Sequence, residues 1–598
     1  MVQRMSAIAD DAPDELPGRP KLNRYLSAAV KLIIALTIAT LITAPFFLRM
    51  DTSPDGRPVR AVVTTDDMAQ HLAVMEQFDL TLRSGVLYPR WQSEFNGGYG
   101  LAWTNFYQPG FFYLTSFINA ILNDWINTLF VISILSLAAS GLALYALSRQ
   151  FYSQWASAIA ALFYMLVPYH LLEIYSRGAM PELQGFIFVP AALYFAYKLG
   201  VEGRPRQYAG LAVFYGLFLM THFPVAYLLT YTLALYAVVW AYLARDIRIA
   251  VRVAVGMIIG LMGSAIYLIP AVLEMKYVRE HFTAIFPYHN SYITLLPGDG
   301  RISALLNQSF AVQSLALIVA ILVLTRVPRA TDKSSEAEQM AADYASSRAP
   351  EIQTRLWIIC GSVTTFMITS YSIYISKLIP KIEAVSFAWR WMVIAGAFTA
   401  LLVGAAVDHL QRSFNLKPRA LWLWRALVGA AVLLCIAVTV QSVVRGTLSN
   451  SSLKRRANHI EEAFVPKSAA GPNDLPDTQK VVIEPHGGSI EILKWEPQQR
   501  EVHVKVDEQS RVRLKTYNFP GWVAKVDGNQ VPILDDQDGA QVVEVSPGIH
   551  RIQASFINTP PRTAGTAVSA LALVLILGLV VLDYVKRGPR APRQSDSA

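Results

Sequence analysis

Charged residues and cysteines are scarce in this chain of 598 residues. Asp, Glu, Lys and Arg make up 16% of the sequence, whereas a soluble globular protein carries about 25%. Hydrophobic residues make up 53%, so the composition excludes an ordinary soluble protein and favours a membrane protein with many spans. The two cysteines, Cys360 and Cys435, lie in apolar runs, which argues against a disulfide framework or a zinc site.

A large charge imbalance and a cleavable signal peptide are also lacking. Lys and Arg (52) modestly outnumber Asp and Glu (43), which gives a net charge of +9. In a membrane protein such an excess usually collects in cytoplasmic loops, so we expect no nucleic-acid partner. Residues 1–25 are acidic and contain proline, unlike a cleavable signal. We expect them to form a cytoplasmic tail ahead of a signal anchor.

Twelve apolar runs approach the length of about 20 residues that a bilayer span needs. They cover residues 26–48, 126–147, 155–174, 180–199, 208–222, 224–243, 250–272, 309–326, 355–376, 386–407, 421–444 and 564–584. We therefore predict a helical membrane domain over 26–444, and a last span with a basic cytoplasmic tail over 564–598. The apolar run at 107–123 would invert everything after it if it crossed, so we expect an interfacial or re-entrant helix there.

Lysine and arginine positions predict the orientation. With a cytoplasmic N-terminus, the basic residues of all even-numbered connections lie inside, and so does the basic C-terminal tail. Those residues are Arg149, Arg204, Arg206, Arg245, Arg248, Arg326, Arg329, Lys333, Arg412, Lys417 and Arg419. The first outer loop is then 49–125, and the charged inside segment 327–354 is predicted to be a flexible connector.

Residues 445–563 differ in composition from the rest of the chain. Hydrophobic residues alternate with polar ones in "REVHVKVD", "SRVRLKTY", "AQVVEVS" and "HRIQASF", and "KVDGNQV" carries an Asp-Gly turn signal. This pattern predicts a β-sandwich domain outside the membrane, tethered by the last span.

The stretch "TTDDMAQH" places acids and a histidine in the first outer loop. If a helix starts there with Thr64 or Thr65 as its N-cap, Asp67 and His71 share a face and Asp66 points elsewhere. A carboxylate beside an imidazole can act as a general base or bind a divalent metal. Alternatively, the two acids only favour the helix N-terminus electrostatically.

Further polar and aromatic residues fall on the same predicted outer face. Aromatic residues of "YPRWQSEFNGGYG" suit stacking on sugar rings, or an interfacial aromatic belt. The arginines can clamp a phosphate or snorkel to lipid phosphates, and a histidine between spans is a functional candidate or a structural residue. The candidate substrate-binding residues are Trp91, Tyr99, Arg177, Glu182, His222, His289 and Arg390.

In their order along the chain, several motifs form a recognisable set. Asp-x-x-x-His is followed by "YPRW", "NFYQPGFFYL", "SRGAMPE", "FAWRW", "EEAFVP" and "YNFPGWVAKVDG". This order resembles the bacterial integral membrane family labelled 6-pyruvoyl-tetrahydropterin synthase-related, whose members look like the GT-C superfamily of polyprenyl-phosphate-dependent glycosyltransferases. The sequence shows no soluble pterin enzyme domain and no His-rich zinc signature.

The resemblance implies a GT-C-like helical fold of the bacterial inner membrane and a sugar transfer outside it. The donor would be a polyprenyl-phosphate-linked sugar from the bilayer, and the acceptor a glycan, lipid or protein. By position, Asp67 would be the base, with Asp66 as the alternative and His71 assisting. Arg177 and Arg390 would hold the donor phosphate. A divalent cation, Mg or Mn, at Asp67 stays open.

A non-catalytic transporter or envelope-assembly scaffold is the rival interpretation. A transporter should place charged residues along a path through the bilayer. Here the candidate residues gather on one predicted face, which favours the transferase.

Overall fold

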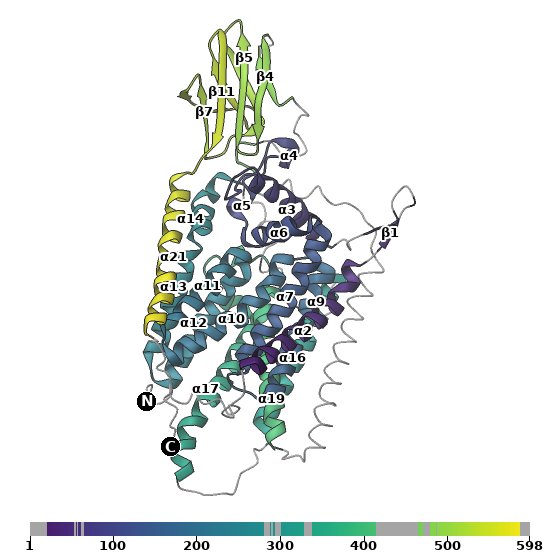
Figure 1. The fold of residues 1–598 in the computed structure, drawn as a ribbon, viewed down its shortest axis with the longest axis vertical. Helices are drawn as coiled ribbons and strands as arrows, with labels where there is room; N and C mark the ends of the chain where they lie inside the picture. The colour runs from purple at the N-terminus through teal and green to yellow at the C-terminus, as the bar shows by residue number, and fades with distance from the viewer. Residues whose placement is uncertain are drawn as a thin grey trace.

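The protein is described by a computed structural model over residues 21–48, 50–52, 56, 58–60, 65–279, 288, 291–293, 301–327, 338–413, 464–469, 479–485 and 487–586. A bundle of long helices carries a β-sandwich at one end (Figure 1). The long helices are α2 (Lys21–Phe47), α7 (Trp125–Ser148), α10 (Met180–Glu202), α11 (Pro205–Thr221), α12 (Phe223–Ala244), α13 (Ile247–Gly263), α16 (Arg301–Arg326), α17 (Glu338–Phe366), α19 (Trp391–Ser413) and α21 (Pro560–Lys586). Helix α8 (Gln154–Leu166) has 13 residues and forms, with the helical turns that follow it, one candidate span of 24 residues from Gln154 to Arg177.

The number of spans is lower in the described residues than the twelve that hydropathy predicts. Eight helices there are long and apolar enough to cross a membrane, or nine with one bent pair. The predicted span at 421–444 lies outside the described residues. Helix α11 has 17 residues, and part of the predicted connector 327–354 belongs to α17 instead. The helical membrane fold is confirmed, whereas the count of twelve is not.

The predicted span at 250–272 corresponds to two helices with a bend between them. Helix α13 and helix α14 (Ala265–Glu274) meet at Ser264 with a bend of 69°. A Gly-Ser pair is a common place for such a break, and Ser569 of α21 satisfies the freed backbone: its hydroxyl accepts from the N–H of Ile266 at 2.8 Å and donates to the carbonyl of Gly263 at 3.0 Å. The last helix therefore stabilises the break in the earlier one.

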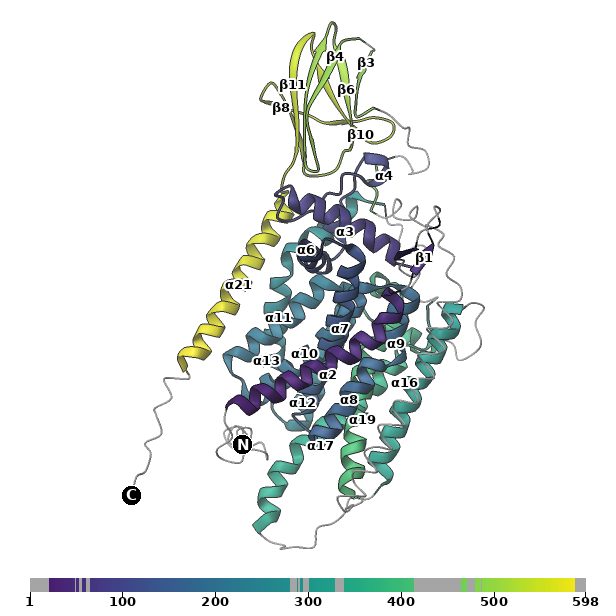
Figure 2. The same cartoon turned by 45° about the vertical axis from the view of Figure 1, so that its right-hand side comes forward.

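Short helices of the first loop lie between the bundle and the β-sandwich (Figure 2). They are α3 (Met68–Arg83), α4 (Phe95–Gly98), α5 (Trp103–Phe106) and α6 (Gly110–Leu122), and a two-stranded ribbon, β1 (Met50–Thr52) and β2 (Pro58–Arg60), precedes them. Helix α6 has 13 residues, too few to cross a bilayer. This length agrees with the interfacial helix expected at 107–123.

Two antiparallel sheets make up the C-terminal sandwich. One has the order β3-β6-β10-β9 and the other β4-β5-β11-β7-β8. The strands are β3 (Val481–Glu484), β4 (Ser489–Glu496), β5 (Gln499–Val506), β6 (Ser510–Tyr517), β7 (Trp522–Val526), β8 (Asn529–Val531), β9 (Leu534–Asp535), β10 (Ala540–Val545) and β11 (Gly548–Phe556). The alternating runs therefore form strands as predicted, and the Asp-Gly pair forms the turn between β7 and β8. The domain limits 445–563 stay a prediction.

A buried ion pair joins the sandwich, the last helix and the first loop. Arg562 of α21 donates to Glu274 of α14 at 2.9 Å, and both side chains are almost fully buried. Arg562 also donates to the carbonyl of Pro520 ahead of β7, and Asn105 of α5 donates to Glu274 at 2.7 Å. The β-sandwich is thus held against the loop that contains Asp67.

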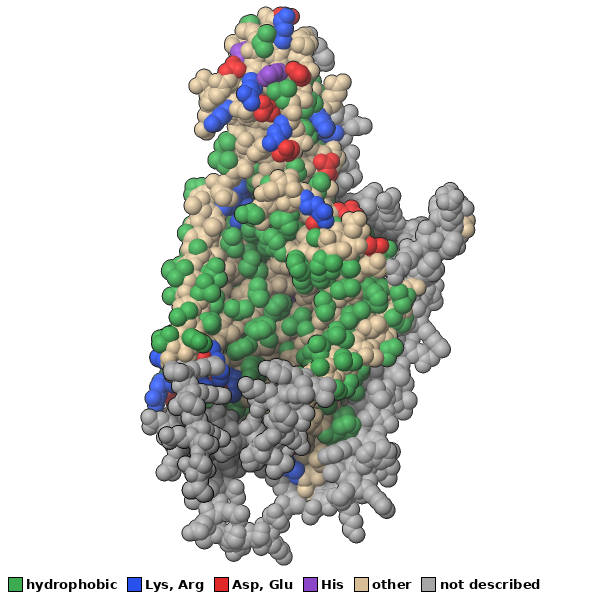
Figure 3. All heavy atoms as spheres, in the orientation of Figure 1, with side chains coloured by type: hydrophobic (Ala, Val, Ile, Leu, Met, Phe, Trp, Pro, Cys, Tyr) green, Lys and Arg blue, Asp and Glu red, His purple; other side chains and the backbone are tan. Residues whose placement is uncertain are grey.

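Charged side chains avoid the middle of the face seen in Figure 3, which is mostly hydrophobic. Lys and Arg gather on that face at the end of the bundle farthest from the sandwich, where the turn between α12 and α13 carries the exposed Arg245 and Arg248. This distribution fits a lipid-facing belt. Which end faces the cytoplasm stays a prediction.

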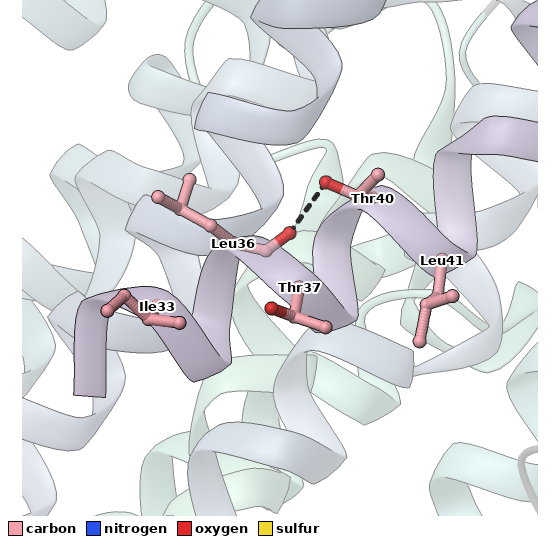
Figure 4. A pocket seen from close by; sticks show the side chains of 5 residues that line it. All are labelled: Ile33, Leu36, Thr37, Thr40 and Leu41. Carbon is pink, nitrogen blue, oxygen red and sulfur yellow. Dashed lines mark hydrogen bonds between the residues drawn. The ribbon is translucent and has the colours of Figure 1, made fainter. Parts of the chain in front are cut away.

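A shallow groove of about 310 Å³ lies along helix α2 (Figure 4). Thr40 donates to the carbonyl of Leu36 at 2.8 Å, so its hydroxyl is already used within the helix. The groove is lined by Ile33, Leu36, Thr37, Thr40 and Leu41. With no charged residue in its lining, it suits a lipid chain and not polar chemistry.

Candidate functional site

The site is built around a π-helical turn, Glu173–Arg177, that follows α9 (Pro168–Leu172). Isolated π-helical turns are rare and are frequently found at functional sites. This one ends at Gly178, whose φ of +65° suits glycine. Arg177 ends the π-helical turn, and Glu182 lies in the first turn of α10.

Arg177 is buried and bound through one terminal nitrogen. Its Nη1 donates to Glu173 at 2.7 Å, to Glu182 at 3.0 Å and to the Tyr169 hydroxyl at 3.2 Å. Its Nη2 lies 3.8 Å from a carboxylate oxygen of Asp67, which is beyond hydrogen-bond distance. The fork of Arg177 is therefore fixed on one side and open on the side of Asp67.

Glu182 connects Arg177 with residues from two other parts of the chain. The Nε of Arg390, in a short 3-10 turn (η6, Ala388–Arg390) before α19, donates to Glu182 at 3.2 Å. The Nε2 of His222, at the break between α11 and α12, lies 3.6 Å from the same oxygen, and Tyr169 donates to the other oxygen at 2.7 Å. One fully buried carboxylate thereby fixes the separation of the two arginines.

Arg390 is also fixed from the chain segment before it. Its Nη1 donates to the carbonyl of Val385. Its Nη2 has no hydrogen-bond acceptor among the described residues. Directly after Val385, Ser386 has φ +64° and ψ −42°. The N–H of Phe387 donates to the carbonyl of Val385 at 2.8 Å. This is a γ-turn, a strained conformation that persists where surrounding contacts hold it. The Phe387 ring lies beneath both guanidiniums, 5.8 Å from Arg177 and 5.0 Å from Arg390.

Asp67 reaches the buried arginine from the start of α3. The helix begins one residue later, with Asp67 and not Thr64 or Thr65 at the N-cap position, and the Asp67 side chain makes no capping hydrogen bond. Its backbone N–H donates to the carbonyl of Arg177 at 2.8 Å, which ties the two segments together. The Asp67 carboxylate is 37% exposed against 5% for Arg177, so it is the part of the site open to solvent.

His71 lies one turn further along α3 and is buried. Burial lowers the pKa of His71 from 6.5 to about 4; the Asp67 carboxylate opposes this shift and the Arg177 guanidinium adds to it. The imidazole is therefore neutral at neutral pH. A neutral ring can accept a proton or a hydrogen bond beside Asp67.

The structure brings together Asp67, His71, Arg177, Glu182, His222 and Arg390, six of the residues that the sequence singled out. Two of the others lie elsewhere. Trp91 is fully buried and packs on Trp522 at 5.6 Å; Tyr99 is also buried and accepts a hydrogen bond from Arg513 at 2.8 Å. Both contact the β-sandwich and not the arginine cluster.

Asp66 and His289 complete the set of sequence candidates. Asp66 is exposed, and its N–H approaches the carbonyl of Ser176 at 3.4 Å. His289 lies outside the described residues.

Three residues of the cluster were not singled out from the sequence. Glu173 and Tyr169 bind Arg177, and Tyr107 lies where the charges of Asp67 and Arg390 act on it. Glu173 precedes Arg177 by four residues, a spacing that pairs charges on a helix, so that signal was present. Tyr169 and Tyr107 carry no comparable local signal.

The described residues contain no group of three His, Cys, Asp or Glu side chains arranged to hold a metal ion. Mg²⁺ is usually bound by one or two carboxylates together with substrate phosphates. Asp67 offers one carboxylate, and the Arg177 guanidinium lies beside it. A divalent cation at Asp67 therefore stays a prediction.

Comparison with known proteins gives one family and several distant structures. A family model described as "6-pyruvoyl-tetrahydropterin synthase related domain; membrane protein" matches residues 104–448. No curated protein matches the chain significantly.

Three solved structures are similar to this chain at low sequence identity. The arabinofuranosyltransferase AftD from Mycobacteria is 15% identical, with 70% of this chain and 26% of that chain covered and a TM-score of 0.42. The oligosaccharyltransferase AglB from Archaeoglobus fulgidus, in complex with an inhibitory peptide and a dolichol-phosphate, is 14% identical, with 69% and 56% covered and a TM-score of 0.37. ArnT from Cupriavidus metallidurans is 14% identical, with 64% and 78% covered and a TM-score of 0.24.

Proposed function

We propose that this chain, which belongs to the 6-pyruvoyl-tetrahydropterin synthase-related family of membrane proteins, is a glycosyltransferase. It transfers a sugar from a polyprenyl-phosphate-linked donor to a hydroxyl of a glycan, lipid or protein on the outer side of the bacterial cytoplasmic membrane. The proposal rests on the arginine cluster and on the motif order that resembles the GT-C superfamily.

One observation carries the proposal: two guanidiniums fixed on Glu182 each keep a nitrogen without an acceptor among the described residues, and that of Arg177 lies beside the exposed carboxylate of Asp67. Arg177 is bound through Nη1, and Arg390 through Nε and Nη1. The Nη2 atom of each has no hydrogen-bond acceptor among the described residues. Arginine nitrogens form strong charge-assisted bonds to phosphate oxygens. Two nitrogens held in place can therefore orient a phosphodiester without reorganising when it binds.

Asp67 has the position and exposure of a general base. In the reaction, its carboxylate accepts the proton of the acceptor hydroxyl while that oxygen attacks the anomeric carbon of the sugar. The bond from the anomeric carbon to the phosphate oxygen breaks, and its electron pair stays on the polyprenyl phosphate, whose charge Arg177 and Arg390 stabilise. A single displacement inverts the anomeric configuration, and Asp67 then releases its proton to solvent.

Transfer of a radiolabelled sugar from synthetic polyprenyl-phosphate donors tests this function. We expect the purified wild type to transfer label and Asp67→Asn to be slower by about 10²-fold or more, since general-base catalysis contributes that much. Asp79→Asn is the matched control, because Asp79 lies on the same helix and pairs with Arg83 at 2.7 Å, away from the cluster.

Two outcomes would count against the proposal. Equal rates for wild type and Asp67→Asn would reject Asp67 as the base. Failure of the wild type to transfer from any donor would favour a non-catalytic scaffold or transporter.

A further inference from the structure

Tyr107 belongs to the first loop and lies beside the arginine cluster. It is extended (φ −99°, ψ 147°) between α5 and α6, and its N–H donates to the carbonyl of Trp103 at 2.9 Å. Its ring centroid lies 6.3 Å from that of His71 and 5.9 Å from that of Trp103. The ring is therefore confined by packing on both sides.

Close backbone packing fixes the segment that carries Tyr107. Gly110, the first residue of α6, lies so near the end of α11 that a Cβ there would be 2.8 Å from the carbonyl oxygen of Met220 and 2.9 Å from the hydroxyl of Thr221. The lack of a side chain at Gly110 lets α6 begin directly against this end. His222, which faces Glu182, is the next residue along, so the Tyr107 segment is fixed beside the cluster.

The Tyr107 hydroxyl is a donor that no acceptor among the described residues uses. It makes no hydrogen bond within the described part of the chain, and its side chain is half-buried. Burial raises the pKa of Tyr107, and the nearby Asp67 carboxylate raises it further, so the hydroxyl keeps its proton at neutral pH. By contrast, the Tyr169 hydroxyl already donates to Glu182 at 2.7 Å.

We propose that the Tyr107 hydroxyl donates a hydrogen bond to the phosphate oxygen from which the sugar departs. The inference rests on the proposed transferase function and adds a catalytic residue to it. Tyr107 packs against His71, one helical turn from Asp67, with ring centroids 6.3 Å apart, and the charges of Asp67, Arg390 and Arg177 act on its hydroxyl. Negative charge grows on the departing oxygen as its bond to the anomeric carbon breaks. A preorganised neutral donor aimed at that oxygen is worth more in the transition state than in the bound donor.

Replacement of Tyr107 by phenylalanine tests the inference. We expect Tyr107→Phe to lower kcat by about 10²-fold, the loss typical of one such donor, while the Kd for undecaprenyl phosphate changes by less than about threefold. Tyr113→Phe is the matched control: Tyr113 lies on α6, and its hydroxyl donates to the carbonyl of Leu87 at 2.6 Å, outside the cluster. That control should transfer at the wild-type rate.

A second variant separates chemistry from a structural effect of the ring. Tyr107→3-fluorotyrosine keeps the hydroxyl and the packing but makes the hydroxyl more acidic. At neutral pH this hydroxyl keeps its proton and can still donate, so a donor role predicts transfer at about the wild-type rate or faster. A rate as low as that of Tyr107→Phe would show that the fit of the ring, and not the hydroxyl, decides the rate, and would overturn the inference.

The outcomes distinguish this inference from the proposed function. If Tyr107→Phe transfers at the wild-type rate while Asp67→Asn does not, the role of Tyr107 is overturned and the transferase stands. If kcat is retained and only the Kd rises, Tyr107 binds the donor without stabilising its departure, and the inference is overturned. If the wild type transfers no sugar, both proposals fail together.

Discussion

His71 is neutral because of where its side chain lies. The histidine is one helical turn from Asp67, buried beside Tyr107 and Phe111, with ring centroids 6.3 and 6.0 Å away. Burial disfavours the imidazolium more than the single nearby carboxylate favours it. A second positive charge is thus kept away from Arg177, and the Asp67 carboxylate is left free to accept a proton.

The burial of His71 predicts a pH dependence of stability. The pKa of His71 is about 4 in the folded protein and about 6.5 in the unfolded chain. The unfolded state therefore binds the proton first, and stability falls as the pH drops from 6.5 towards 4, by up to about 3 kcal/mol from this residue. His71→Gln should remove that share, so the melting curve of the variant in detergent should depend less on pH. Equal pH dependence of Tm in both proteins would contradict the assignment.

Some residues of the site could be predicted from the sequence because each is polar in an apolar surrounding. Arg177, Glu182, His222 and Arg390 interrupt or border long hydrophobic runs, and such residues are functional candidates in a membrane protein. Tyr169 is different. In the sequence it is one of many aromatic residues in apolar runs, and only the folded chain brings its hydroxyl to Glu182.

At the scale of elements, the π-helical turn and the start of α3 act as one unit. The N–H of Asp67 donates to the carbonyl of Arg177, and the chain reverses at Gly178 directly against Thr65. A Cβ on Gly178 would lie 1.9 Å from the Thr65 hydroxyl. The position of Asp67 relative to Arg177 therefore depends on the absence of a side chain at Gly178.

Gly178→Ala should displace Asp67 from Arg177. Because misplacement of a reacting group by about 1 Å can cost about 10²-fold in rate, we expect a loss of that order in kcat together with a lower Tm. Gly85→Ala is the control: Gly85 also has positive φ, +93°, but no atom lies within 4 Å of its Cβ position. That variant should cost only about 1–2 kcal/mol of backbone strain and leave transfer unchanged.

Removal of the Thr65 hydroxyl separates collision from strain. The double variant Thr65→Ala, Gly178→Ala should recover part of the transfer rate that Gly178→Ala loses. The collision between the new Cβ and the Thr65 hydroxyl is then relieved, whereas the backbone strain of alanine at positive φ stays. If Gly178→Ala alone transfers normally, the coupling between these two segments is wrong.

Hydropathy predicts helices well where they are straight and less well where they break. The runs at 126–147 and 180–199 correspond to α7 and α10 within a few residues, because length and apolarity determine these helices. The bend at Ser264 depends on Ser569, which is about three hundred residues away in sequence. The π-helical turn likewise arises from packing that no local pattern records.

At the scale of the whole molecule, the site exists only in the folded bundle. Asp67, Arg177 and Arg390 come from the first loop, from the helix before α10 and from the helix start of α19, and Glu182 joins the last two. The sequence predicted them on one face from the distribution of Lys and Arg. It did not predict that Trp91 and Tyr99 pack on the β-sandwich, because that contact joins parts of the chain more than 400 residues apart.

The central claim is that Arg177 and Arg390 bind the donor phosphate, and the affinity for undecaprenyl phosphate tests it most directly. Loss of one charge-assisted hydrogen bond costs about 1.5–3 kcal/mol, so Arg390→Gln should raise the Kd by about 10- to 100-fold. Arg355→Gln, which removes an exposed arginine paired with Glu351 at 2.8 Å, should bind as the wild type does. An unchanged Kd for Arg390→Gln would contradict the account.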